Sequence, residues 1–243
     1  MDVEDGFILG IDNYCDRWCE TCAFTSRCRA FADRAELEAG EDPHLKAIAE
    51  APPLPQDMPP PPPRWMQELI DDLNKAVAKP ISDNEYRKLC PDMSEEHKLI
   101  VTRAHAYADR VHTWLESHNV VSKLDPGDPR SVIRWFQYSI AAKTYRALRG
   151  LACDDPQERD WPADHDGSAK VALLGIERSH AAWLNLVHRG FATPSEIEPA
   201  IADVIWLCDE LEAVFPHARA FVRPGFDEPE EVARLVAAEG GRS

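Results

Sequence analysis

The segment DPRSVIRWFQYSIAAKTYRALRG, residues 128–150, decides the fold of this 243-residue chain more clearly than any other. Asp128 is a residue type that caps helix N-termini, and Pro129 suits the first helical position. After them, apolar and aromatic side chains cover almost the whole circumference of a helix up to Gly150. Such a helix must be surrounded by other elements, so we expect it to be the central, most buried helix of its domain.

Apolar residues recur at helical spacing in four further segments. Ser94 and Thr193 are N-cap residues for two of them, and Asp166 or Ser168 caps a third. No strand-like alternation is long enough to build a sheet. The sequence therefore predicts a mainly α fold, a helical bundle of four to five long helices with a small N-terminal cysteine-rich metal-binding module. The expected helices cover about residues 65–79, 94–118, 129–150, 167–189 and 194–216.

Composition along the chain predicts four parts. A cysteine-rich head is followed by a short helix near Asp42 to Glu50 and by a proline-rich spacer, PPLPQDMPPPPP. Proline fixes its φ angle and lacks an N–H, so we expect this spacer to be an extended polyproline II segment. The helical bundle and an acidic tail complete the chain. The predicted boundaries are 1–35 for the head, 36–63 for the helix and spacer, 64–216 for the bundle and 217–243 for the tail.

The net charge of −16 excludes several partners. Nucleic-acid binding depends on Lys and Arg, and anionic membrane surfaces also attract basic proteins. The sequence starts with acidic residues, and no stretch approaches the roughly 18 apolar residues of a membrane span. We therefore expect a cytoplasmic protein that binds neither nucleic acid nor membranes. An odd number of cysteines, seven, favours metal binding and free thiols over a disulfide framework.

The most specific signal is a group of four cysteines within fourteen residues, namely Cys15, Cys19, Cys22 and Cys28. Thiolates are soft ligands, and four of them in one short segment can complete a tetrahedral metal site without help from the rest of the chain. A structural zinc site is the preferred interpretation, an iron–sulfur cluster is the alternative, and four unliganded thiols remain the least favoured. Aromatic side chains between these cysteines should pack around the metal and against the bundle: Tyr14, Trp18, Phe24 and Phe31.

Two known cysteine patterns do not fit. The first three cysteines match the Cys-x3-Cys-x2-Cys spacing of radical S-adenosylmethionine enzymes, but those enzymes need alternating strands and helices, which this sequence lacks. Zinc knuckles that bind RNA have a similar span, but the acidic chain argues against that role. The run YCDRWCETCAFTSRC, residues 14–28, together with DGSAKVAL, residues 166–173, resembles a group of uncharacterised bacterial helical proteins. That resemblance implies a bacterial origin and a common architecture, and no activity.

Polar pairs on two helices have the spacing of a di-iron site, but their positions on the helices argue against one. Asp109 with His112 and Glu177 with His180 have the spacing of the Glu-x-x-His pairs of ferritin-like proteins. On a helical wheel, Asp109 and His112 lie well away from the apolar face of their helix, whereas Glu177 and His180 lie on or beside theirs. The 129–149 helix supplies no carboxylate, so a di-iron centre lacks ligands.

Charged residues on apolar helix faces instead predict an internal polar network. Lys143 and Arg146 lie on the most apolar helix, and a buried charge must be paired. Glu177 is the expected partner, with His180 beside it. The alternative is that these four residues line a small cavity that binds an anionic ligand or performs acid–base chemistry.

The sequence as a whole predicts a cytoplasmic metal-binding helical protein. Its head would serve structure or redox sensing, and its bundle would bind a protein or a small anionic ligand. The alternatives are an enzyme with a polar site inside the bundle around Glu177 and His180, or an iron–sulfur protein.

Overall fold

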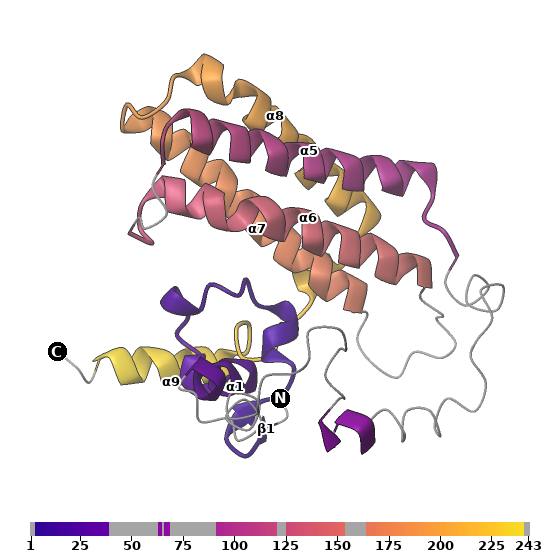
Figure 1. Cartoon of the computed structure of the whole chain (residues 1–243), viewed down its shortest axis with the longest axis vertical. Coiled ribbons are helices and arrows are strands. Elements are labelled where there is room, and N and C mark those ends of the chain that lie inside the picture. The colour runs from indigo at the N-terminus through magenta and orange to yellow at the C-terminus, as the bar shows by residue number, and fades with distance from the viewer. Residues whose placement is uncertain are drawn as a thin grey trace, which may run out of the picture. The chain divides into compact units, whose positions relative to one another are not determined.

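The computed structural model describes residues 3–38, 63–64, 66–68, 91–120, 125–153 and 164–240, with side chains up to residue 234 in the last range (Figure 1). Within these residues the chain is mainly helical, as predicted. The helix expected near residues 42–50, spacer residues 52–62 and the helix expected at 65–79 (apart from residues 66–68) lie outside the described residues. Contacts divide the chain into two compact units. One combines Met1–Ala32 with Asp92–Ser243, and the other is Asp33–Pro91.

Four long helices form the bundle, in which α5 packs against α6 and α8, and α7 packs against the same two helices. Their N-termini are held by the residues that the sequence indicates. The Ser94 hydroxyl accepts the His97 N–H at 3.1 Å, and the Asp128 carboxylate accepts the Arg130 N–H at 2.8 Å. The bundle helices are α5 (Glu95–Ser117), α6 (Pro129–Cys153), α7 (Asp164–His188) and α8 (Pro194–Val214).

The central helix of the bundle is α7, and the prediction that α6 is the most buried helix is wrong. Thirteen residues of α7 are buried, compared with nine of α6, and Tyr138 and Tyr145 of α6 are 54% and 47% exposed. Small side chains allow α6 to approach α7 closely, because a Cβ at Gly175 would lie 3.0 Å from the Phe136 ring. The number of bulky apolar residues favours α6 as the most buried helix. It does not account for the small residues of α7, which let neighbouring helices approach closely and make α7 central.

The head is built from short elements. A hairpin pairs β1 (Val3–Glu4) with β2 (Phe7–Ile8) through Asp5 and Gly6, which both have positive φ, as tight hairpin turns require. A small apolar core follows, in which Ile8, Ile11 and Phe24 are at most 5% exposed. The remaining head elements are η1 (Ile11–Tyr14), η2 (Cys19–Thr21), η3 (Thr25–Arg27) and α1 (Arg29–Glu38).

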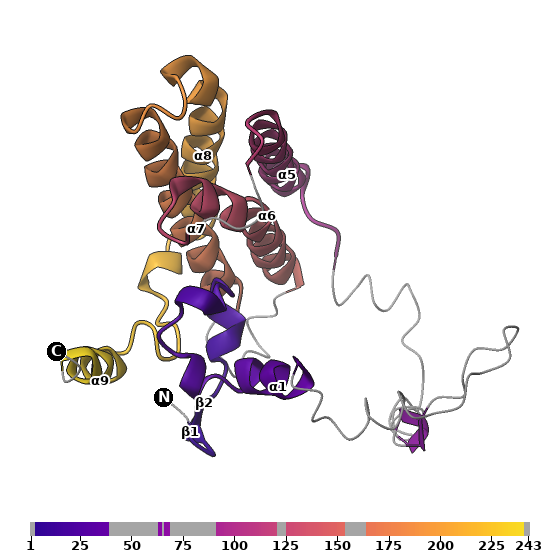
Figure 2. The same cartoon turned by 60° about the vertical axis from the view of Figure 1, so that its left-hand side comes forward.

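The C-terminal segment packs on the head. After η4 (Ala218–Ala220), the Phe226 ring meets the Phe24 ring edge-on at 4.8 Å between centroids. Helix α9 (Pro229–Gly240) follows, and its buried Glu231 accepts a hydrogen bond from Arg27 at 3.2 Å. In both views the head and this segment lie together beside α6 and α7 (Figures 1 and 2). The acidic tail expected at 217–243 therefore supplies apolar and charged groups to the head.

Two further findings concern the expectations from composition. Among the described residues, no helix is long and apolar enough to cross a membrane. Cys208 is a free thiol, but Cys153 is disulfide-bonded, so the expectation of free thiols is wrong at Cys153. Cys90 lies outside the described residues.

Candidate metal centre

The four clustered cysteines line one small cavity in the head. Three short 3-10 turns place them there: Cys15, Cys22 and Cys28 are the C-cap residues of η1, η2 and η3, and Cys19 is the first residue of η2. All four line the same cavity of about 20 Å³, and all four are free thiols. A cavity of this volume has room for about one water-sized group. Cysteines separated by up to thirteen positions thus line one cavity.

The walls of this cavity are apolar. Ile11, Phe24, Phe31 and Phe226 line it together with the cysteines. Phe24 is 5% exposed and belongs to the core of the head, whereas Phe226 comes from the C-terminal segment. The head therefore depends on a residue about 200 positions away to cover its cysteines, all of which are half-buried.

Two sulfur atoms accept backbone hydrogen bonds from the residue two positions later. The Phe24 N–H donates to Cys22 Sγ at 3.4 Å, and the Arg17 N–H donates to Cys15. Burial raises the pKa of both thiols, and these hydrogen bonds oppose that increase. Cys15 Sγ also donates to the Asp12 carbonyl at 3.4 Å, so both thiols are protonated in the metal-free head, and the two backbone N–H groups would favour the thiolate form once a metal binds.

The thiols surround the cavity without being drawn together. Within the described parts of the chain, no three His, Cys, Asp or Glu side chains are close enough to hold one metal ion as they stand. A tetrahedral zinc with Zn–S bonds of about 2.3 Å needs sulfur atoms only about 3.8 Å apart. The described arrangement is wider than that.

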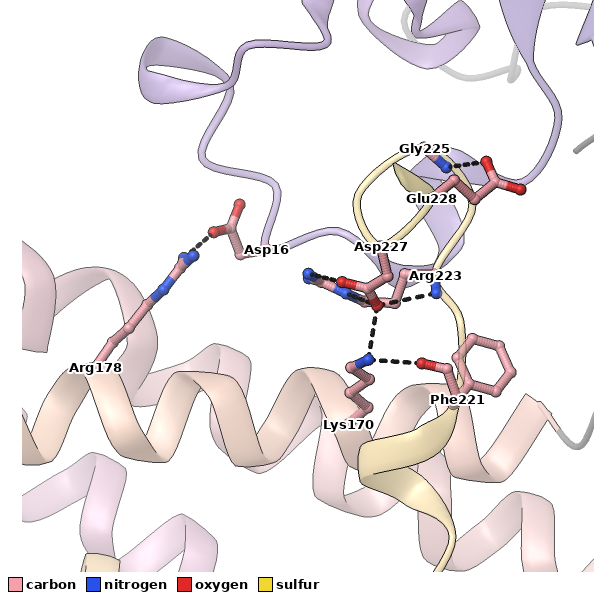
Figure 3. A network of polar contacts seen from close by, with 8 residues as sticks. All are labelled: Asp16, Lys170, Arg178, Phe221, Arg223, Gly225, Asp227 and Glu228. Atoms are coloured by element: carbon pink, nitrogen blue, oxygen red, sulfur yellow. Dashed lines mark hydrogen bonds and ion pairs between the residues drawn. The ribbon is translucent and has the colours of Figure 1, made fainter. Parts of the chain in front are cut away.

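The segment between the first two cysteines attaches the head to the bundle. The Asp16 carboxylate pairs with Arg178 of α7 at 2.5 Å (Figure 3). The Asp16 carbonyl accepts the Trp135 indole N–H of α6 at 2.8 Å. The Trp18 ring stacks on Trp135 with 5.4 Å between centroids. Arg17, between Asp16 and Trp18 in the sequence, has a φ of 57°. This left-handed conformation costs energy for any residue with a Cβ. The expectation that the Trp18 ring packs against the bundle is confirmed.

Lys143 and Arg146 contact the head and do not contact Glu177. Lys143 donates to the Asn13 carbonyl at 2.7 Å, and Arg146 pairs with Asp164 at 2.7 Å. Burial lowers the Lys143 pKa, and the nearby Arg146 charge lowers it further. Asp164 also accepts a hydrogen bond from the Tyr14 hydroxyl at 2.9 Å. These basic residues therefore hold the peptide that leads to Cys15.

The predicted internal network is accordingly wrong. Glu177 is exposed and pairs with Arg219 at 2.6 Å. Because η4 folds back against α7, it brings Arg219 to Glu177, and that return could not be seen in a helical wheel. His180 is half-buried on the same helix. The prediction that Asp109 and His112 face away from the core is confirmed, since both are exposed and His112 pairs with Glu116 at 3.3 Å.

A second polar cluster fixes the C-terminal segment to α7. The Asp227 carboxylate accepts hydrogen bonds from Arg223 at 2.8 Å and pairs with Lys170 at 2.7 Å, and Lys170 also donates to the Phe221 carbonyl (Figure 3). Burial alone would raise the Asp227 pKa, but these donors hold it well below its usual range. Gly225 then turns the chain with a φ of 77° toward the head core.

Sequence reasoning missed these attachment residues. On the sequence alone, Trp135 belongs to the apolar surface of its helix, and nothing marks Arg178 as a contact. The segment from Phe221 to Phe226 falls in the predicted acidic tail, although two phenylalanines flanking a glycine indicate that it packs against something. A larger cavity of about 460 Å³ also lies between Trp18 of the head and Phe136 of α6.

Comparisons with protein families, curated proteins and solved structures found no match for this chain. The case for its function therefore rests on the geometry of the site.

Proposed function

We propose that this chain is a metal-binding protein in which Cys15, Cys19, Cys22 and Cys28 together hold a metal centre. The observation that carries this proposal is that all four thiols line one apolar-walled cavity. Four half-buried free thiols around one cavity offer a complete set of soft ligands, and metal coordination would stabilise them as thiolates. The backbone N–H groups directed at Cys15 and Cys22 support the same proposal.

The charges around the head also support a thiolate centre. Four thiolates and one Zn²⁺ would carry a net charge of about −2. In a chain with a net charge of −16, Lys143, Arg146 and Arg178 lie against the peptides beside Cys15. Arg146 and Arg178 are already paired with Asp164 and Asp16, so the basic group here that would offset the negative centre is Lys143, which donates to the Asn13 carbonyl.

Zinc and an iron–sulfur cluster remain the two candidates for the metal. A Cys₄ set suits a closed structural zinc site, which is the simpler proposal. A cluster spans several atoms and is held by four cysteine thiolates as well.

The role that we propose for the centre is to organise the head and fasten it to the bundle. Among the described residues of the head, three side chains are buried in its core, too few for it to fold independently of other elements. Small modules of this kind gain their stability from a metal.

Metal analysis of anaerobically purified protein tests this proposal. We expect about one zinc ion, or one cluster, per chain. Replacing Cys19 and Cys22 by Ser should abolish metal content, because two ligands are lost. The matched control Cys208→Ser removes a free thiol of α8 and should leave metal content unchanged. Full metal retention in the double variant would refute the proposal. A brown protein identifies a cluster, and a colourless metal-bound protein identifies zinc.

A second candidate function, binding of a small ligand, has one supporting observation. The cavity of about 460 Å³ between head and bundle lies within the size range of small-molecule sites, and it is bordered by Trp18, Phe136 and the Arg178 side chain. A fragment screen by NMR would test it. Binding that disappears in Ala181→Trp, which fills the cavity from its exposed edge, would support this function.

A further inference from the structure

We propose that the metal state of the cysteine centre controls whether the head stays docked on α6 and α7. This inference rests on the proposed metal function and adds its regulation. Loss of the metal releases the head from the bundle, and loss of docking lowers the affinity of the four cysteines for the metal. Two sites whose free energies are coupled must affect each other in both directions.

The first support is the position of the docking groups in the chain. Asp16 and Trp18 make the contacts with Arg178 and Trp135, and both lie between Cys15 and Cys19. The loop from Cys15 to Cys19 therefore supplies two ligands to the metal. The same loop supplies one carboxylate, one carbonyl and one indole ring to its contacts with the bundle. Any rearrangement of Cys15 relative to Cys19 must move these docking groups.

The second support is the strain within that loop. Arg17 lies midway between the two ligands with a φ of 57°. A non-glycine residue holds this conformation only when its surroundings impose it. Here Cys15 and Cys19 would fix the ends of the loop through the metal, while Asp16 and Trp18 fix its middle through the bundle. When the metal leaves, the loop can relax and the docking groups separate from their partners.

The third support is that the ion pair of this loop is weak by itself. The Asp16–Arg178 pair involves side chains that are 25% and 51% exposed, and pairs this accessible to water contribute little individually. Docking therefore depends on several groups being presented together, which is what an ordered ligand loop achieves. Undocking would uncover Trp135, Phe136 and Lys143, an aromatic and basic surface on an otherwise acidic chain.

Hydroxyl-radical footprinting of the full-length protein, before and after removal of the metal with a chelator, tests the first direction. We expect oxidation of Trp135 to rise after metal removal. The half-buried Trp206 of α8, which contacts Arg103 and not the head, is the matched control and should not change. Equal oxidation of Trp135 in both states would overturn the inference. It would leave the proposed metal centre intact, because metal content is measured separately.

Metal affinity of an interface variant tests the reverse direction. Arg178→Gln removes the partner of Asp16 without touching a ligand, and we expect metal affinity to fall at least about fivefold, a typical coupling between sites. Glu177→Gln changes the neighbouring residue, which pairs away from the head, and should leave affinity unchanged. Unchanged affinity in Arg178→Gln would overturn the inference, as would an equal loss in both variants. A wild-type protein that binds no metal would refute the proposed function itself.

Discussion

At the scale of single residues, partner geometry decides how much a charged group contributes to stability. Asp203 of α8 shows this clearly. Its carboxylate is buried and accepts hydrogen bonds from Arg103 and Arg110 of α5, both at 2.9 Å. The Arg103 guanidinium also lies over the Trp206 ring at 4.7 Å. This cluster holds α5 against α8, and it takes the place of the ion-pair network that the sequence predicted around Glu177.

Asp203→Ala should therefore lower the free energy of unfolding by roughly 2–4 kcal/mol, because two charge-assisted hydrogen bonds are lost at a buried carboxylate. Chemical denaturation measures this change. Asp209→Ala, an exposed position on the same helix, is the control and should change stability by less than about 0.5 kcal/mol. A loss of similar size in both variants would contradict a specific role for Asp203.

Glu177→Ala tests the corrected assignment at its own position. The pair with Arg219 is about half-exposed on both sides, so its contribution should be small. We expect a loss of at most about 1 kcal/mol, within the range of surface ion pairs. Thermal unfolding measures this loss. A loss of 3 kcal/mol or more is in the range of a broken buried pair and would support the buried network predicted around Glu177.

At the scale of elements, close contact between α7 and the head is possible because Gly167 has no side chain. A Cβ there would lie 2.3 Å from the Tyr14 ring and 2.7 Å from the Phe221 ring. These rings come from the head and from the C-terminal segment, and their centroids are 4.7 Å apart. One glycine thus lets both segments meet the start of α7.

Gly167→Ala should lower the free energy of unfolding by about 1–3 kcal/mol, because the added methyl displaces two rings. Alanine has a higher helix propensity than glycine by up to about 1 kcal/mol. A stabilised variant would therefore show that the Tyr14 and Phe221 rings move aside at little cost. Urea denaturation distinguishes these outcomes. Gly150→Ala of α6 is the comparison, since its nearest contact is a milder 3.3 Å to His165 Cβ.

The attachment of the C-terminal segment to α7 should depend on pH through Asp227. Its pKa in the folded protein lies below the value of about 3.9 expected when unfolded. The stabilisation is therefore complete above about pH 4 and is lost as the pH falls toward the folded pKa, because the unfolded chain then binds more protons. Stability measured between about pH 6 and pH 3 should fall less in Asp227→Asn than in the wild type. Parallel curves would contradict this role.

At the scale of the whole molecule, the two ends of the chain combine. Phe226 completes the cavity of the cysteines, and Arg27 pairs with the buried Glu231. The head and the bundle belong to one compact unit, and residues 33–91 form another. The head is therefore part of the domain formed by the bundle, and the segment that links them in sequence is not part of that unit.

A protein beginning at Arg64 should keep its helical circular dichroism, because α5–α8 share a continuous core of their own. Its melting temperature should nevertheless fall by several degrees, since Trp135, Phe221 and Phe226 lose the rings that cover them. An unchanged melting temperature would show that docking of the head contributes nothing to stability. Loss of the helical signal would show that the bundle cannot fold without the head.

The sequence by itself determined the features that arise from neighbouring residues. Helix periodicity and the caps at Ser94, Asp128 and Thr193 predicted the bundle helices to within a few residues, because these signals act over one or two turns. The spacing of Cys15, Cys19, Cys22 and Cys28 indicated that they act together, since a short segment limits how far apart they can be.

Only the tertiary structure decided which distant groups meet. Arg219 reaches Glu177, Asp16 reaches Arg178, and Phe226 reaches the cysteine cavity, across separations of 42, 162 and about 200 residues. No periodicity relates such positions, because they are brought together by the packing of helices and by the return of η4 along α7. The central position of α7 could not be predicted from the sequence for a related reason. Its small side chains contribute to burial only because neighbouring helices pack closely against them, and that packing is a tertiary contact.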